Sequence, residues 1–214
     1  MSTPRAYTAD TTAAAQVGTS NYVDESGKYI GEITLAESVT SKRGTEGIEI
    51  SFLTREGQQA NYLTLWTYNE SSEALYGYKV LSALMTVMGV SRIEPKQGDI
   101  KDRDGNQRRV IAFPALHKVP VGLVLQKEYY TKQDGTGGYK FNIIVPFNAQ
   151  TELTAKEMID GVTQPKTLAG VIATLKDKGT PIESRPTTQQ SNGYANTTVG
   201  NYDDPFGDEF GQGF

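Results

Sequence analysis

Several residue types are absent or rare in this chain, and each absence removes a class of function. The 214 residues include no cysteine, one histidine and one tryptophan. Without cysteine there is no disulfide framework, thiolate zinc site or thiol nucleophile, and this composition fits a reducing cytoplasm. No apolar run of about 18 residues appears, which argues against a membrane-spanning helix. The first residues lack a basic segment followed by an apolar one, so we expect no secretory signal.

Signals for catalysis are also few. The only histidine, His117, stands beside Lys118 and Pro120 at the expected start of a strand. The chain has no G-x-S-x-G pattern, and Gly135–Gly138 lacks the Lys-Ser/Thr that completes a phosphate-binding loop. Residues 102–106 read as a turn, because a calcium loop needs its glycine at the sixth position and a carboxylate at the twelfth, whereas here the glycine is fourth and the twelfth residue is Phe113. We therefore expect no catalysis, cofactor or metal; a hydrolase would need a carboxylate and a hydroxyl beside His117 in a cleft.

Charge and composition divide the chain into three parts. The formal net charge is −4. The four acids that account for it lie near the C-terminus: Asp203, Asp204, Asp208 and Glu209. No lysine or arginine follows Arg185, and the residues around it are rich in Gln, Asn, Thr and Gly. We expect a flexible arm over 1–20, one folded domain over 21–183, and a disordered linker with an acidic tail over 184–214.

Alternation of apolar and polar residues predicts strands in the folded part. In one of them Ile48, Ile50 and Phe52 fall on one face, with Glu49 and Ser51 on the other. The expected strands are Lys28–Glu37, Gly47–Arg55, Gln59–Tyr68, Arg108–Phe113, Val119–Thr131 and Gly138–Phe147. The last two are joined by a glycine-containing segment that is typical of a hairpin loop.

Apolar residues at helical spacing predict a helix over Ser71–Gly89, capped by Asn69 or Ser71 and ended by the glycine. Two shorter helical segments follow in 151–180, the first with a capping-box pattern at Thr154 and Glu157.

The order of these elements favours a particular fold. Three strands, a helix and two or three further strands are the order of an OB-fold, a small Greek-key barrel with its helix between strands three and four. We therefore expect a mainly β protein with helices (α+β), OB-fold-like, with a helical C-terminal extension. Another small barrel and a sandwich are the alternatives.

The third expected strand carries an aromatic surface. Leu63 and Leu65 share one face, whereas Tyr62, Trp66 and Tyr68 share the other. If the leucines point into a barrel, the three rings lie on its outer face, where nucleic-acid bases stack with little sequence preference. Alternatively, the rings belong to the core or lie beneath the helix.

Cations occur in the loops around this strand and near a later hairpin. In OB-folds the loops after the first strand and between the last two contact bound oligonucleotides, so cations there would meet phosphates in a salt-dependent way. The candidates for phosphate contact are Lys42, Arg43, Arg55, Arg103, Arg108, Arg109 and Lys132. The alternative is that these cations simply lie in solvent-exposed turns and contact no ligand.

The tail points to a family. The segment Asp203-Asp204-Pro205-Phe206 resembles the acidic tip with which bacterial single-stranded DNA-binding proteins bind replication and repair partners. There the tip is the extreme C-terminus, whereas here eight residues follow it. The ending is more similar to the acidic, aromatic-ended tails of bacteriophage single-stranded DNA-binding proteins. The residues that the resemblance implies for partner binding are Asp203, Asp204, Phe206, Asp208, Glu209, Phe210 and Phe214.

The resemblance implies an OB-fold protein that coats single strands in phage replication or recombination, in the cytoplasm of the bacterial host. Its expected partners are single-stranded DNA and, through the tail, replication or recombination proteins; a homo-oligomer is compatible with the sequence. The acidic tail is also expected to compete with DNA for the protein's own groove, because a linker holds it at high effective concentration. The alternative is a non-enzymatic protein-interaction or virion-associated barrel with a docking tail. Exposed rings at Tyr62, Trp66 and Tyr68 beside cations would favour DNA, and buried rings the alternative.

Overall fold

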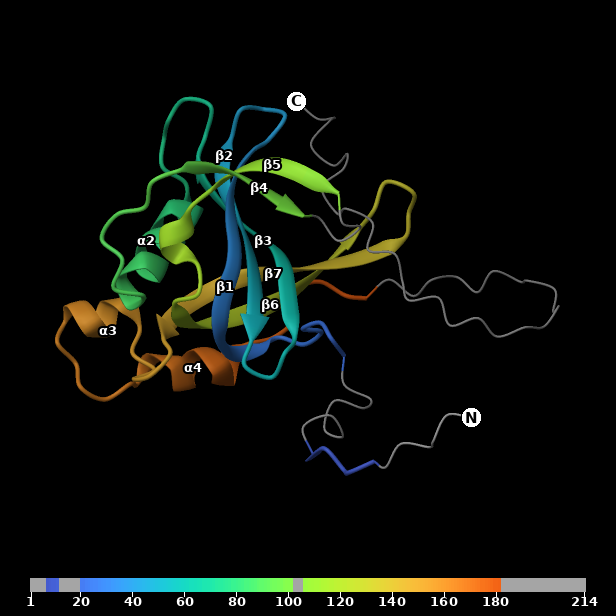
Figure 1. Cartoon of the computed structure of the whole chain (residues 1–214). Coiled ribbons are helices and arrows are strands. Elements are labelled where there is room, and N and C mark those ends of the chain that lie inside the picture. Colours follow the sequence, from blue (N-terminus) through green and yellow to red (C-terminus); the bar gives the residue numbers. More distant parts are fainter. Residues whose placement is uncertain (1–6, 12–19, 102–105, 182–214) are drawn as a thin grey trace.

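The computed structural model describes residues 7–11, 20–101 and 106–181, and its fold is mainly β with few helices (Figure 1). The strands are β1 (Gly27–Thr40), β2 (Glu46–Thr54), β3 (Gln59–Tyr68), β4 (Lys96–Lys101), β5 (Gln107–Ala112), β6 (Pro120–Thr131) and β7 (Gly137–Asn148). The helices are α2 (Tyr76–Val87), α3 (Ala155–Ile159) and α4 (Thr167–Thr174), with a 3-10 turn η1 (Pro114–Leu116). The sequence prediction of a mainly β protein is confirmed at this level.

The sheet is antiparallel and is organised around β1. One edge of β1 pairs with β2, which pairs with β3. The other edge is shared, since the first part of β1 pairs with β6 and Glu37 pairs with Ala112 of β5. A register shift between Ile33 and Leu35 marks the point of division. Such an irregularity bends a strand, which lets β1 serve two partners along one edge.

Two hairpins extend the sheet from β1. β7 pairs with β6, and β4 pairs with β5. In Figure 1 β6 and β7 cross the direction of β1, β2 and β3. The two ends of the path β3-β2-β1-β6-β7 approach each other, because β3 and β7 have Cα atoms within 8 Å, although no ladder is recorded between them.

The main core fills the space between these strands and α2. It contains the inward residues of β1, β2 and β3, such as Ile33, Ile50 and Leu63, together with Leu84 of α2 and Leu123 of β6. A second, smaller cluster lies where α4 packs. Its buried members are Val124, Phe147 and Leu168. Because β6 contributes to both clusters, its first half is buried on both faces.

The helix boundaries correct one part of the prediction. α2 begins at Tyr76 rather than Ser71, and no side chain caps it. Asn69 instead holds a turn before the helix, where its Oδ1 accepts a hydrogen bond from the amide of Glu73 at 2.9 Å. The predicted end is confirmed, since Gly89 follows the helix with φ +69°. The capping box of Thr154 and Glu157 at the start of α3 is also confirmed.

The strand β4 was not expected, because the sequence reads as a polar connection there. Ile100 is its only apolar residue, and nearly all of the strand is exposed. The strand forms through its ladder with β5 and not through burial of an apolar face. Figure 1 shows the β4–β5 hairpin lying across one end of the sheet.

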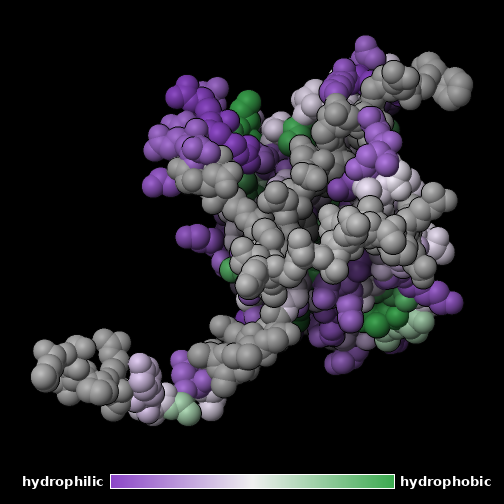
Figure 2. Space-filling view, turned by 90° about the vertical axis from the view of Figure 1, so that its right-hand side faces the viewer, coloured by the Kyte–Doolittle hydropathy of each residue, from purple (hydrophilic) through white to green (hydrophobic). Residues whose placement is uncertain are grey.

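The surface also bears on function. On the side seen in Figure 2 the described residues are mostly hydrophilic, and the apolar ones gather in a few small patches. Among the helices of the described residues, none is both long and apolar enough to span a bilayer.

Candidate nucleic-acid interface

The aromatic row, defined as Tyr62, Trp66 and Tyr68 of β3, lies on the side of the sheet that faces away from the core. Leu63 and Leu65, which alternate with these rings, are buried. Tyr62 is 43% exposed, and the other two side chains are half-buried. The predicted separation of leucines and aromatics onto two faces is confirmed. The alternative, in which the rings belong to the core or lie beneath the helix, is wrong for Tyr62 but correct in part for Tyr68, whose ring contacts Tyr78 of α2.

A close contact between strands fixes Trp66. Trp66 pairs with Gly47 of β2, and a Cβ atom added to Gly47 would lie 2.8 Å from Cε3 of the indole. The indole therefore rests on a strand position that has no side chain. On the backbone side, Gly77 of α2 packs against the carbonyl of Trp66, and a Cβ there would overlap it. Two glycines thus set the position of the only tryptophan.

Tyr62 occupies an irregular point of β3. Its φ is +60°, in the left-handed region that side chains rarely adopt. The register between β2 and β3 shifts here, since Ile50 pairs with Leu63 whereas Phe52 pairs with Ala60. The extra residue is a β-bulge, a device that redirects a side chain at functional sites. Backbone strain of this kind clusters at ligand sites, where the surrounding structure maintains it.

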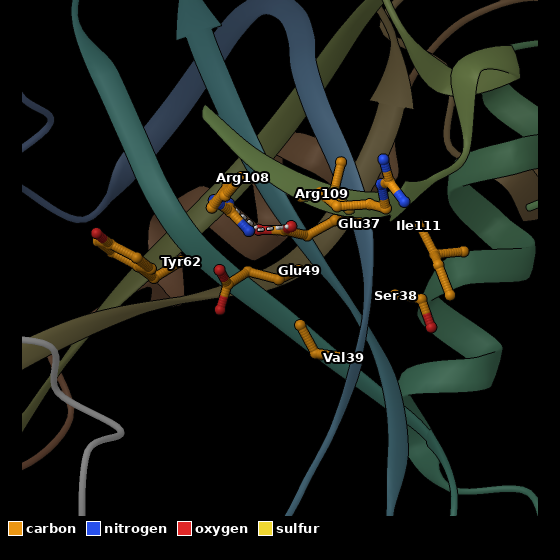
Figure 3. Close-up of a pocket in the computed structure, with 9 residues that line it drawn as sticks. Glu37, Ser38, Val39, Glu49, Tyr62, Arg108, Arg109 and Ile111 are labelled. Atoms are coloured by element: carbon orange, nitrogen blue, oxygen red, sulfur yellow. Dashed lines mark hydrogen bonds and ion pairs between the residues drawn. The ribbon is translucent and has the colours of Figure 1, made fainter. Parts of the chain in front are cut away.

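A groove of about 660 Å³ opens beside Tyr62 (Figure 3). Its lining comes from four strands: Glu37, Ser38 and Val39 of β1, Glu49 of β2, Tyr62 of β3, and Arg108, Arg109, Val110 and Ile111 of β5. The β4–β5 hairpin therefore supplies one wall, and the outer face of β1, β2 and β3 supplies the floor.

Charge in the groove is arranged in pairs. Arg108 donates two hydrogen bonds to Glu37, at 2.8 Å to Oε2 and 2.7 Å to Oε1. Glu37 is only 7% exposed, so this bidentate pair neutralises a buried carboxylate. Arg109 contacts Asp99 of β4 at 3.3 Å, and both of these side chains are exposed. Arg109 therefore keeps a solvent-accessible guanidinium at the groove wall.

The other predicted phosphate contacts are dispersed. Lys42 and Arg43 are exposed in the β1–β2 loop, which lies beyond the Glu46–Tyr68 pair at the end of the aromatic row. Arg55 lies in the β2–β3 turn and lines a separate hollow with Lys28. Lys132 lies in the loop of the β6–β7 hairpin, outside the groove lining. Of the six predicted cations that lie in the described residues, the structure brings only Arg108 and Arg109 into the groove.

Some predicted residues lie outside the described part of the chain. Arg103 belongs to this group. So do all of the predicted partner-binding residues: Asp203, Asp204, Phe206, Asp208, Glu209, Phe210 and Phe214.

One tyrosine that the sequence prediction missed, Tyr78 of α2, contacts the aromatic row, and a second, Tyr76, is exposed nearby in the sequence. The rings of Tyr68 and Tyr78 have centroids 5.3 Å apart, and Tyr76 is 72% exposed in the first turn of α2. Burial, with Tyr78 and Glu46 close by, raises the pKa of the Tyr68 hydroxyl above its ordinary value. The sequence placed these tyrosines within a longer helix, where their exposure was not apparent.

His117 has a structural contact. Its Nε2 accepts a hydrogen bond from the amide of Ala36 at 3.1 Å, which ties η1 to β1. Burial lowers the pKa of the imidazole below its ordinary value, consistent with a neutral ring that accepts. This nitrogen is thus engaged by the backbone and does not face the groove lining.

Two comparisons with known proteins found no match. No protein-family model matches the chain, and no curated protein sequence matches it significantly. The interpretation of the site therefore depends on its geometry.

Proposed function

We propose that this protein is a non-enzymatic, sequence-non-specific single-stranded DNA-binding protein, which binds the strand across the outer face of β2 and β3. The observation that carries the proposal is the aromatic row, held outside the core beside a groove with an arginine wall. Stacking of bases on such rings contributes about 1–3 kcal/mol per base and tolerates any sequence.

The strand order supports an OB-fold assignment within this proposal. Along the path β3-β2-β1-β6-β7, the helix α2 follows the third strand of the chain, and β3 approaches β7. This order agrees with that of a five-stranded, partly open Greek-key barrel, in which the β4–β5 hairpin would be an insertion between the helix and the fourth strand. In OB-folds the face of strands two and three binds oligonucleotides. The corresponding face here is that of β2 and β3, where Tyr62 and Trp66 lie.

The positions of the exposed cations agree with single-stranded DNA bound with its phosphates directed away from the sheet. Arg109 at the groove wall is exposed, as are Lys42 and Arg43 at the end of the aromatic row. Contacts of this kind release counterions, so affinity should fall as salt rises. A body with no net positive charge and a few local cations is compatible with moderate affinity that depends on stacking. We further propose that the tail recruits replication or recombination proteins of the host or phage.

The test is a binding titration with a labelled single strand and a labelled duplex, followed by anisotropy. Tyr62→Ala should weaken single-strand binding by roughly tenfold, because one stacking partner is lost. Tyr62→Phe is the matched control, since it keeps the ring and removes only the hydroxyl. If Tyr62→Ala and wild type bind the single strand with equal affinity, the binding site does not lie on this face. Absence of single-strand binding by the wild type would refute the function.

A protein-interaction module is the second candidate. Ile159 of α3 is 75% exposed and Ile172 of α4 is 39% exposed. A protein partner that binds on this side of the molecule would cover these two side chains. If the titration shows no nucleic-acid binding, this candidate becomes the leading one.

A further inference from the structure

The floor of the groove contains carboxylates, which is unexpected for a surface that receives a polyanion. On the outer face, Glu37, Glu49 and Thr64 form one transverse row across β1, β2 and β3, since each pairs with its neighbour in the ladder. Glu37 is neutralised by Arg108. Glu49 is half-buried, and its Oε2 accepts a weak hydrogen bond from the Thr64 hydroxyl at 3.4 Å.

This row lies between two stacking positions. Trp66 and Gly47 form the next row in one direction, and Tyr62 lies at the bulge in the other. Rows on one face of a strand are about 7 Å apart, since each residue advances the chain by about 3.3 Å. Glu49 is therefore close to the edge of a base that stacks on Tyr62. Figure 3 shows its carboxylate directed toward the side of the groove where Tyr62 lies.

The charge of the floor determines which part of a nucleotide can face it. A carboxylate repels phosphate, but it accepts hydrogen bonds from the exocyclic amino groups of bases, as Glu and Asp do with N4 of cytosine. The bases should therefore face Glu49, while the phosphates run toward Arg109 and the solvent. Thymine has no amino group; its one donor, N3–H, lies between two carbonyl oxygens, so a carboxylate that approaches it is repelled by these oxygens.

We propose that Glu49 accepts a hydrogen bond from the amino group of a base stacked on Tyr62, and that the groove therefore discriminates against thymine. Cytosine, adenine and guanine each carry an amino group that can donate. This inference rests on the proposed function and adds a base preference to it. Glu49 is then the residue that determines this preference.

The test compares oligo-dC with oligo-dT of equal length at neutral pH, by anisotropy, for wild type and Glu49→Gln. Wild type should bind oligo-dC at least about threefold more tightly, because cytosine donates its amino group to the charged acceptor, whereas the one donor of thymine lies between two carbonyl oxygens that the carboxylate repels. Glu49→Gln should bind oligo-dT more tightly than wild type does, and should lose most of the preference. Its amide can both donate and accept, so it serves either base.

Two controls separate base reading from other effects. Glu56→Gln removes an equal charge from the exposed β2–β3 turn, outside the groove, and should keep the wild-type ratio. An oligonucleotide in which 2-pyrimidinone replaces cytosine lacks only the amino group, and should bind wild type no better than oligo-dT.

Each outcome decides the inference. Loss of the preference in Glu49→Gln, with retention in Glu56→Gln, supports it. An unchanged dC-to-dT ratio in Glu49→Gln, with intact binding of both strands, overturns the base preference and leaves the proposed function standing. Failure of the wild type to bind either strand overturns the proposed function, and the inference with it.

Discussion

At the scale of single residues, Tyr62 combines backbone strain with a proposed ligand contact, and two substitutions can separate these roles. Glycine adopts φ +60° without cost, whereas alanine does not. The Tyr62→Gly variant should therefore be more stable than Tyr62→Ala, with a free energy of unfolding about 1 kcal/mol higher, although glycine usually weakens a strand. Both variants should lose affinity for single strands to the same degree. Chemical denaturation with parallel anisotropy titrations measures this; a less stable glycine variant would contradict the left-handed conformation.

The two arginines of the groove wall should behave differently. Arg108→Ala leaves Glu37 buried without its bidentate donor, so it should lower the free energy of unfolding by about 1–3 kcal/mol. Arg109→Ala removes an exposed side chain and should change stability by no more than about 0.5 kcal/mol. It should, however, reduce the slope of log affinity against log salt by roughly 0.7, the value for one phosphate contact. An unchanged slope would exclude Arg109 from the phosphate path.

The residue-level prediction from sequence succeeded where alternation is regular and failed where a residue depends on distant partners. The outward placement of Tyr62 and Trp66 follows from alternation with Leu63 and Leu65. The bulge at Tyr62 breaks the alternation, since Ala60 is buried. No local pattern indicates the Arg108–Glu37 pair either, because 71 positions separate the two residues and the β1–β5 pairing unites them.

At the scale of elements, Glu157 joins α3 to the start of α4. Its carboxylate accepts hydrogen bonds from the amide and hydroxyl of Thr154, the amide of Lys166, and the amide and hydroxyl of Thr167. These donors, with the Thr154 amide contributing most, hold the pKa of Glu157 far below its ordinary value of 4.5.

The sign of this shift gives a pH prediction. A lowered folded-state pKa stabilises the fold above the ordinary value, and this stabilisation is lost as pH falls from about 4.5 through the folded-state pKa. Glu157→Gln should be less stable than wild type at neutral pH. Its stability should also fall less than that of wild type when the pH is lowered. Urea denaturation at a series of pH values measures both.

The control is Glu94→Gln, which breaks an exposed pair with Arg92 and should change stability by at most about 0.5 kcal/mol. Parallel pH profiles for wild type and Glu157→Gln would contradict the role.

Element prediction worked where an element buries an apolar face. The strands of the core and the end of α2 at Gly89 follow from such patterns. The hairpin strand β4 could not be found this way, because it buries almost nothing and depends on its ladder with β5. The start of α2 was placed too early because residues before Tyr76 form a turn stabilised by Asn69, which mimics a cap in sequence.

At the scale of the whole molecule, the acidic tail beyond the described residues stays a prediction from sequence. Deleting residues 203–214 should tighten single-strand binding at low salt and abolish partner recruitment, because four carboxylates no longer compete with phosphates. A full-length variant with those four acids changed to amides is the matched control. It should reproduce the tighter binding while it keeps the phenylalanines. Unchanged affinity of both variants at low salt would contradict the competition.

The measurement that tests the account most directly uses Trp66, the only tryptophan, as its reporter. A single strand and a duplex are each titrated into the protein at low and high salt, and tryptophan fluorescence is followed together with the anisotropy of a label on the oligonucleotide. If bases stack on the outer face of β3, the single strand should quench the fluorescence strongly, salt should weaken the effect, and the duplex should quench far less. Binding without quenching would place the strand away from this face, and neither binding nor quenching would contradict the function itself.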